Sequence, residues 1–271
     1  MKVVEEFLAA KTGNDADCED GIVVTEGFAA VIDGATDKTG RKFRGLRGGR
    51  FAMLACADAV RSLEPTADVN ATLAHLSVTL AGRMPENLGP AERPSAVLAI
   101  YSQAHQEVWQ IGDVCFWHPG LGDSGFWQPK TVDRYATDLR VAVLQAELAR
   151  GADPSALVRS DPGREAIIGL LRQQGIFCNN LGAGEWAFPA VDGSAVPPDL
   201  VTISHIPSGV TELVMASDGY PCVLPTLAAS EQALARLIAG DPLCMGPLRG
   251  TKGVVPGNMS FDDRAYLRLA L

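Results

Sequence analysis

The chain has 271 residues, of which 47% are hydrophobic and 20% charged, a composition typical of a soluble globular protein with one large domain or two small ones. Its formal net charge of −9 argues against a nucleic-acid partner, because binding to a phosphate backbone needs clustered Lys and Arg in excess. The six scattered cysteines form no Cys-x-x-Cys pair, so zinc sites and disulfide frameworks lack support and a reducing cytoplasm fits best.

The sequence also lacks the usual signals for export and for membrane insertion. Met1 to Ala10 carries two glutamates and lacks the basic-then-apolar order of a secretory signal. Periodicity leaves this first segment open between a strand and a short helix. No stretch approaches the ~20 apolar residues of a membrane helix, so we expect no membrane partner.

The segment from Asp20 to Gly34 predicts a tight β-hairpin. Two runs of β-branched and aromatic residues are joined by Glu26-Gly27, a link typical of a two-residue turn. The register that follows places Asp20 opposite Asp33, with Cβ atoms roughly 4.5–5.5 Å apart. Two ionised carboxylates this close repel unless a proton or a cation lies between them. A hard divalent cation is the natural occupant, and ordinary acidic residues at strand ends are the alternative.

Further along the chain, groups of strands alternate with pairs of helices. A loop rich in Gly, Thr and basic residues is expected over Ala35 to Gly49, and further loops over Gly120 to Lys130, Asn179 to Pro198 and Gly240 to Gly257. Strands are predicted over Ser95–Tyr101, Glu107–Ile111, Val114–His118, Leu200–Ile206, Thr211–Ala216 and Ala265–Leu271, and helices over Arg50–Leu63, Asp68–Gly82, Asp138–Arg150, Gly163–Gln174 and Ala228–Ala239. This order favours an α+β fold with antiparallel sheets, in one domain spanning residues 1–271.

Several aspartates share one sequence context, the end of an apolar strand. A glycine lies beside most of them and lets the backbone approach a bound ion. Carboxylate, carbonyl and water oxygens suit Mg²⁺ and Mn²⁺. The residues are Asp33 before Gly34, Asp113 after Gly112, Asp218 before Gly219, and Asp262 just before the final strand, with Asp20 facing Asp33. Together they predict an oxygen-rich site for one or two divalent cations.

At this point the sequence resembles the metal-dependent protein phosphatases of type 2C. The resemblance lies in five ordered blocks: Cys18-Glu19-Asp20, Val31-Ile32-Asp33-Gly34, Ile111-Gly112-Asp113, Met215-Ala216-Ser217-Asp218-Gly219 and Asp262-Asp263. It implies a four-layer α-β-β-α sandwich, with two central antiparallel sheets flanked by helix pairs. It also implies hydrolysis of phosphoserine and phosphothreonine esters on a phosphorylated protein, by water activated between two Mn²⁺ or Mg²⁺ ions.

The same resemblance implies a role for each acidic position. Asp20, Asp33, Asp218 and Asp262 would be catalytic as metal ligands, the backbone carbonyl of Gly34 would join them, and Asp113 would lie near a third, more weakly held ion. A variable flap beside the active site would correspond to a segment around residues 131–180.

Three departures from the family pattern bear on activity. Ala35-Thr36-Asp37-Lys38 stands where relatives carry a small residue and two glycines, and Val114-Cys115 follows Asp113 in place of a serine and often an arginine. Lys11 to Asp17 contains no arginine, whereas several relatives bind substrate phosphate with an arginine there. The basic stretch from Arg41 to Arg50 is a candidate substitute.

These departures keep other interpretations open. One is a catalytically weak or inactive relative that senses or binds a phosphorylated partner, and another is hydrolysis of a small phosphoester. A hydrolase of the haloacid dehalogenase kind needs a second aspartate two residues after Asp33, where Ala35 stands. A serine hydrolase is weaker still, because Ser217 has no Gly-x-Ser-x-Gly frame.

Overall fold

The computed structural model describes residues 1–121 and 130–271, so that most of the loop expected over Gly120 to Lys130 lies outside the description. Within these ranges the fold is built on two antiparallel sheets. The first contains, in spatial order, β1 (Lys2–Ala9), β11 (Arg264–Ala270), β10 (Glu212–Ala216) and β8 (Cys115–Trp117). The second contains β2 (Asp20–Val24), β3 (Phe28–Gly34), β6 (Ala96–Ser102), β7 (Glu107–Ile111) and β9 (Thr202–His205). The predicted α+β class with antiparallel sheets is therefore confirmed.

The hairpin of β2 and β3 has the register that the Glu26-Gly27 turn predicts. Asp20 is paired with Asp33, and Val24 with Ala29. On its other side β3 pairs with β6, where Asp33 lies opposite Val97. The register therefore brings two carboxylates to the same end of the second sheet.

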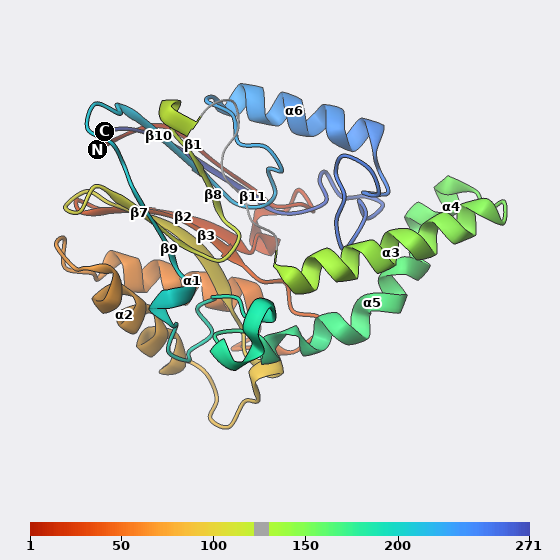
Figure 1. Cartoon of the computed structure of the whole chain (residues 1–271), viewed down its shortest axis with the longest axis horizontal. Helices are drawn as coiled ribbons and strands as arrows, with labels where there is room; N and C mark the ends of the chain where they lie inside the picture. The colour runs from red at the N-terminus through yellow and green to blue at the C-terminus, as the bar shows by residue number, and fades with distance from the viewer. Residues whose placement is uncertain (122–129) are drawn as a thin grey trace.

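Three hydrophobic clusters hold sheets and helices together. One lies between the second sheet and the helix pair α1 (Gly48–Arg61) and α2 (Val69–Ala81), and includes Ile32, Phe51 and Leu76. A second joins the facing sides of the two sheets, with Val31 and Met215 among its members. A third lies between the first sheet and α6 (Leu227–Gly240). Figure 1 shows α1 and α2 on one side of the paired sheets and α6 on the other.

The helix termini follow ordinary capping rules, which explains several boundaries. Asp68 caps α2 by accepting a hydrogen bond from the N–H of Ala71. α1 begins two residues before the expected Arg50, without a side-chain cap. In its first turn Gly49 packs against Gly34, where a Cβ on either glycine would collide with the other's backbone. The expected loop before this helix also contains a short hairpin, β4 (Lys42–Phe43) and β5 (Leu46–Arg47).

A helical arm occupies the region where a flap was expected. α3 (Thr131–Ala149) begins seven residues before the predicted start at Asp138, and is followed by α4 (Pro154–Arg159) and α5 (Pro162–Gln173). Figure 1 shows these three helices extending together away from the sheets. None of the helices in the described residues is both long and apolar enough to cross a membrane.

The arm is fixed to residues 243–250 by one buried arginine. Arg140 of α3 is fully buried. Its guanidinium donates hydrogen bonds to the Asp161 carboxylate and to the backbone carbonyls of Leu243, Cys244 and Gly250, at 2.7–3.1 Å. A buried guanidinium needs this many partners to compensate for lost hydration.

Candidate metal centre

The five predicted aspartates lie at the ends of strands from both sheets. Asp20 begins β2 and Asp33 precedes Gly34 at the end of β3, while Asp113 follows β7. Asp218 follows β10, and Asp262 comes two residues before β11. Asp20 and Asp113 are buried and the other three are half-buried.

Electrostatic interactions among these carboxylates raise the pKa values of Asp33 and Asp218. Burial raises the pKa of Asp33 well above its usual range, and the negative charges of Asp20, Asp262 and Asp113 raise it further. Burial also raises the pKa of Asp218, with contributions from Asp33, Asp262 and Asp113. Because Asp262 and Asp113 add to the raised pKa values of both Asp33 and Asp218, the group favours bound protons or cations.

Asp20 belongs to the same acidic group. Burial raises its pKa well above the usual range, a hydrogen bond with Ser217 opposes the shift, and the charges of Asp262, Asp263 and Asp218 add to it. Oδ2 of Asp20 is buried without a hydrogen-bond partner among the described residues. An unpartnered buried carboxylate oxygen is costly, and a bound cation or water would satisfy it.

Asp262 differs because two lysines already hold it. Its Oδ1 lies 2.9 Å from Nζ of Lys11, and its Oδ2 lies 2.5 Å from Nζ of Lys252. Although burial alone would raise the pKa of Asp262, Lys252 and Lys11 hold it well below the usual range. Both carboxylate oxygens of this predicted ligand are therefore bound to ammonium groups.

Two charged residues beside the aspartates, Lys130 and Asp263, have roles that the sequence did not predict. Lys130, just before α3, lies 3.0 Å from the carboxylate of Asp113. The neighbouring carboxylate of Asp263 accepts hydrogen bonds from the backbone N–H groups of Lys11 and Glu19 at 2.7 and 3.0 Å. Asp263 thus ties the end of β1 to the start of β2, although the sequence block containing it had suggested a role only for Asp262.

The residues have the oxygen ligands that a divalent cation prefers, but their side chains are not arranged around a common point in this structure. Among the described residues, no three Asp, Glu, His or Cys side chains lie close enough together to hold a metal ion as they stand. The buried, unpartnered oxygens of Asp20 and Glu19 and the mutual repulsion at Asp33 and Asp218 nevertheless favour added positive charge. Binding at Asp262 requires that a lysine leave one of its oxygens.

A cleft opens beside these carboxylates. Its volume is about 410 Å³, and its lining includes Asp113, Asp133, Asp218, Lys252 and Asp262. Residues from α3 and from the segment before β11 form its walls. The acidic group is therefore accessible to a ligand from solution.

The basic stretch from Arg41 to Arg50 does not converge on one point. Arg41 forms an ion pair with Glu92 at 2.6 Å, and Arg50 donates to the backbone carbonyls of Asp15 and Cys18. Lys42 is exposed on the β4–β5 hairpin. The suggestion that this stretch binds phosphate stays a prediction.

Comparison with known proteins gives a fold but no close sequence relative. No family model matches the sequence, and no curated protein matches it significantly. The serine/threonine phosphatase Stp1 from Staphylococcus aureus is similar in structure, with a TM-score of 0.52 at 12% identity over 100% of this chain and 96% of that one. A bacterial serine phosphatase gives a TM-score of 0.50 at 13% identity over 98% and 96% of the two chains.

A looser match, with a TM-score of 0.45 at 17% identity over 97% and 95% of the two chains, is the catalytic domain of the serine/threonine phosphatase PstP, solved with two manganese ions. The matches to Stp1 and to the bacterial serine phosphatase span nearly the whole of both chains. The chain therefore has the fold of the type 2C serine/threonine protein phosphatases.

Proposed function

We propose that the chain is a metal-dependent phosphomonoester hydrolase whose substrate is a phosphoserine or phosphothreonine protein. The observation that carries the proposal is the convergence of carboxylates from both sheets at an open cleft, where the charges of Asp262 and Asp113 raise the pKa values of both Asp33 and Asp218. Such a group is suited to divalent cations rather than to organic ligands. A small phosphoester is the alternative substrate.

The proposed ligands are Asp20, Asp33, Asp218 and Asp262 with the backbone carbonyl of Gly34, for two Mn²⁺ or Mg²⁺ ions, and Asp113 for a third. When bound, such ions polarise phosphoryl oxygens and activate water for in-line attack. We interpret the whole chain, residues 1–271, as one domain of the four-layer α-β-β-α type, with helix pairs outside both sheets and the arm as its flap. The cluster between the second sheet and α1 and α2 supports one of these helix pairs, and the cluster under α6 supports a helix outside the first sheet.

The chain's own residues prepare the site by adjusting charge. Asp20, Asp33 and Asp218 have raised pKa values, so cation binding releases the protons that these carboxyls hold. Lys130 keeps Asp113 oriented by an ion pair of 3.0 Å. Lys252 holds one oxygen of Asp262 until a cation replaces it.

A second candidate function follows from the lysines. Lys11 and Lys252 occupy both oxygens of Asp262, which is the arrangement expected if the chain neutralises its own acidic site. In that case it binds or senses a phosphorylated partner without hydrolysing it. The altered sequence from Ala35 to Lys38 also favours this alternative.

The deciding experiment measures phosphate release from phosphoserine and phosphothreonine peptides with Mn²⁺, with Mg²⁺ and with a chelator. We expect release only with metal, and a loss of at least about 100-fold in Asp33→Asn and Asp218→Asn, because each removes a ligand charge. Asp138→Asn is the matched control, since Asp138 lines the same cleft but pairs with Arg249 at the surface. Release that persists in both variants would refute the metal mechanism, and a folded protein without release would favour the sensing function.

A further inference from the structure

A phosphatase needs a cation for the phosphoryl oxygens of its substrate, and the usual candidates in this chain are already engaged. The segment from Lys11 to Asp17 has no arginine. Arg50 reaches this segment, but its Nη1 donates to the backbone carbonyls of Asp15 and Cys18 at 3.3 and 2.5 Å. Lys11 itself is held between Asp262 and Asp263.

The basic residues nearest the acidic group are engaged in the same way. Lys130 pairs with Asp113, and Lys252 pairs with Asp262. Arg164 of α5 donates to the backbone carbonyl of Thr251 at 3.0 Å. Binding a phosphoryl group through Lys130 or Lys252 would break an existing ion pair.

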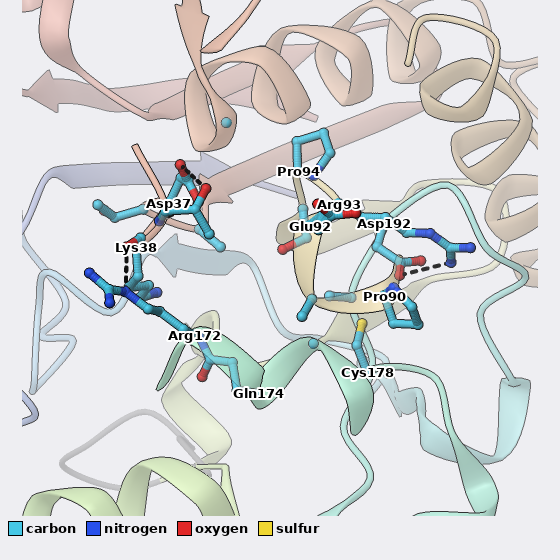
Figure 2. Close-up of a pocket in the computed structure, with 18 of the residues that line it drawn as sticks. Asp37, Lys38, Pro90, Glu92, Arg93, Pro94, Arg172, Gln174, Cys178 and Asp192 are labelled. Carbon is cyan, nitrogen blue, oxygen red and sulfur yellow. Dashed lines mark hydrogen bonds and ion pairs between the residues drawn. The ribbon is translucent and has the colours of Figure 1, made fainter. Parts of the chain in front are cut away.

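Lys38 is different, because its ammonium has no ion-pair partner within 4.0 Å in the part of the chain that the structure describes. It is only half-exposed, and it lines a second cleft together with Lys130 and Arg172. Arg172 lies directly beside it, as Figure 2 shows, with its Nε donating to the Lys38 backbone carbonyl at 3.1 Å. This hydrogen bond leaves the two terminal guanidinium nitrogens of Arg172 available to an anion.

The charges around Lys38 favour an incoming anion. Burial lowers the pKa of Lys38 to about 8, Asp133 opposes the shift, and Lys130, Lys252 and Arg164 add to it. Lys130, which lines the same cleft as Lys38, pairs with Asp113, and Asp113 lines the cleft beside the aspartates. A dianion bound by Lys38 and Arg172 would be stabilised by charge-assisted hydrogen bonds.

We propose that Lys38, supported by Arg172, binds the phosphoryl oxygens of a phosphate monoester dianion. The proposal rests on the proposed hydrolase function, whose substrate it would hold. It also gives a purpose to the sequence from Ala35 to Lys38, which brings a cation to the site in place of the missing arginine. Lys38 acts by positioning the phosphoryl group, while the aspartates hold the cations.

The kinetic test compares Lys38→Gln with Lys2→Gln, the same substitution at an exposed lysine at the start of β1. With p-nitrophenyl phosphate and Mn²⁺, we expect Lys38→Gln to raise KM about tenfold or more, the effect of losing one charged hydrogen bond. Lys38→Arg should restore most of the affinity, since it keeps the charge. Calorimetric Mn²⁺ affinity should be the same in all three variants as in the wild-type protein.

A second test needs no turnover. The protein is acylated with an N-hydroxysuccinimide ester, in inorganic phosphate or in chloride of equal ionic strength, and the labelled lysines are identified by mass spectrometry. We expect phosphate to protect Lys38 and not Lys2. Equal labelling of Lys38 in both salts, or an unchanged KM in Lys38→Gln, would overturn the proposal.

The two tests also separate this proposal from the proposed function. Metal-dependent hydrolysis with the same KM in Lys38→Gln would refute the role of Lys38 and leave the hydrolase intact. Phosphate protection of Lys38 in a protein without hydrolysis would support the phosphate site and refute the hydrolase.

Discussion

Replacing Lys252 by methionine should strengthen metal binding, because the lysine competes for a proposed ligand. Nζ of Lys252 lies 2.5 Å from Oδ2 of Asp262, so that oxygen cannot bind a cation until the ammonium withdraws. Methionine keeps the apolar stem of the side chain and removes only the charge and its hydrogen bonds. Lys11 still pairs with the other oxygen in the variant.

The magnitude follows from the exposure of the pair. The side chains of Lys252 and Asp262 are 26% and 20% exposed, which places the pair between exposed ion pairs, worth about 0.2–1 kcal/mol, and buried ones, whose disruption costs about 3–5 kcal/mol. Breaking this pair should therefore cost about 1–2 kcal/mol. Since 1.4 kcal/mol corresponds to a factor of ten, Lys252→Met should lower the Kd for Mn²⁺ about 5- to 30-fold.

The assay is calorimetric titration of Mn²⁺ into chelator-treated protein at fixed pH and ionic strength. Arg249→Met is the control, because Arg249 lines the same cleft but pairs with Asp138 rather than with Asp262. It should change the Kd less than about twofold, the size of a screened surface charge. An unchanged or weaker Mn²⁺ affinity in Lys252→Met would refute competition at Asp262, and equal gains in both variants would mean that only overall charge matters.

Three further outcomes are expected. In denaturant titrations, the free energy of unfolding of the metal-free protein should fall as pH rises above the ordinary carboxyl pKa of 3.8, because the raised pKa values of Asp33 and Asp218 make the folded state hold more protons. Excess Mg²⁺ should make the free energy of unfolding depend less steeply on pH. A steeper dependence with Mg²⁺ would contradict the reasoning. Asp33→Asn should stabilise the metal-free protein by about 1–2 kcal/mol near pH 7.5 by removing repulsion, and equal or lower stability would contradict it. Arg140→Met should lower the free energy of unfolding by about 3 kcal/mol in the same titrations, because it removes the donor to Asp161 and to three backbone carbonyls. Arg150→Met at the surface should cost less than about 0.5 kcal/mol. Equal costs would refute the role of Arg140 in fixing the arm.

Much of the fold could be predicted because its signals are local. The turn at Glu26-Gly27 determined the register of β2 and β3, and β7 has the bounds expected from its apolar run. α4 falls between two predicted helices, and Pro154 hides it because proline usually interrupts a helix. In the structure Pro154 begins the helix behind an Asp153 cap, a position where its missing N–H costs nothing.

The first strand and the short hairpin were harder for other reasons. β1 alternates between exposed and half-buried residues, but Val4 and Leu8 are apolar on its exposed side, which hides the alternation. The β4–β5 turn uses Arg44 and Gly45 with positive φ values of 50° and 84°. Arginine is an unusual residue for that conformation, so the sequence indicated only a loop.

The candidate site also contains some residues that the sequence could predict and others that it could not. Each aspartate carries its own local signal, a strand end, in most cases with an adjacent glycine, and its role as a metal ligand stays a prediction. The lysines carry no such signal, because their partners are set by tertiary contacts. Lys11 and Asp262 are 251 positions apart, and Lys252 reaches Asp262 from an irregular segment.

Two arginines of the arm bind the backbone directly before Lys252, the lysine that pairs with Asp262. Arg140 fixes the arm to the backbone up to Gly250, and Arg164 grips the carbonyl of Thr251, the residue just before Lys252. Because these two arginines bond to the backbone directly before Lys252, we expect the position of the arm to influence the ion pair between Lys252 and Asp262. A ligand that binds to the arm would then change how firmly that carboxylate is held.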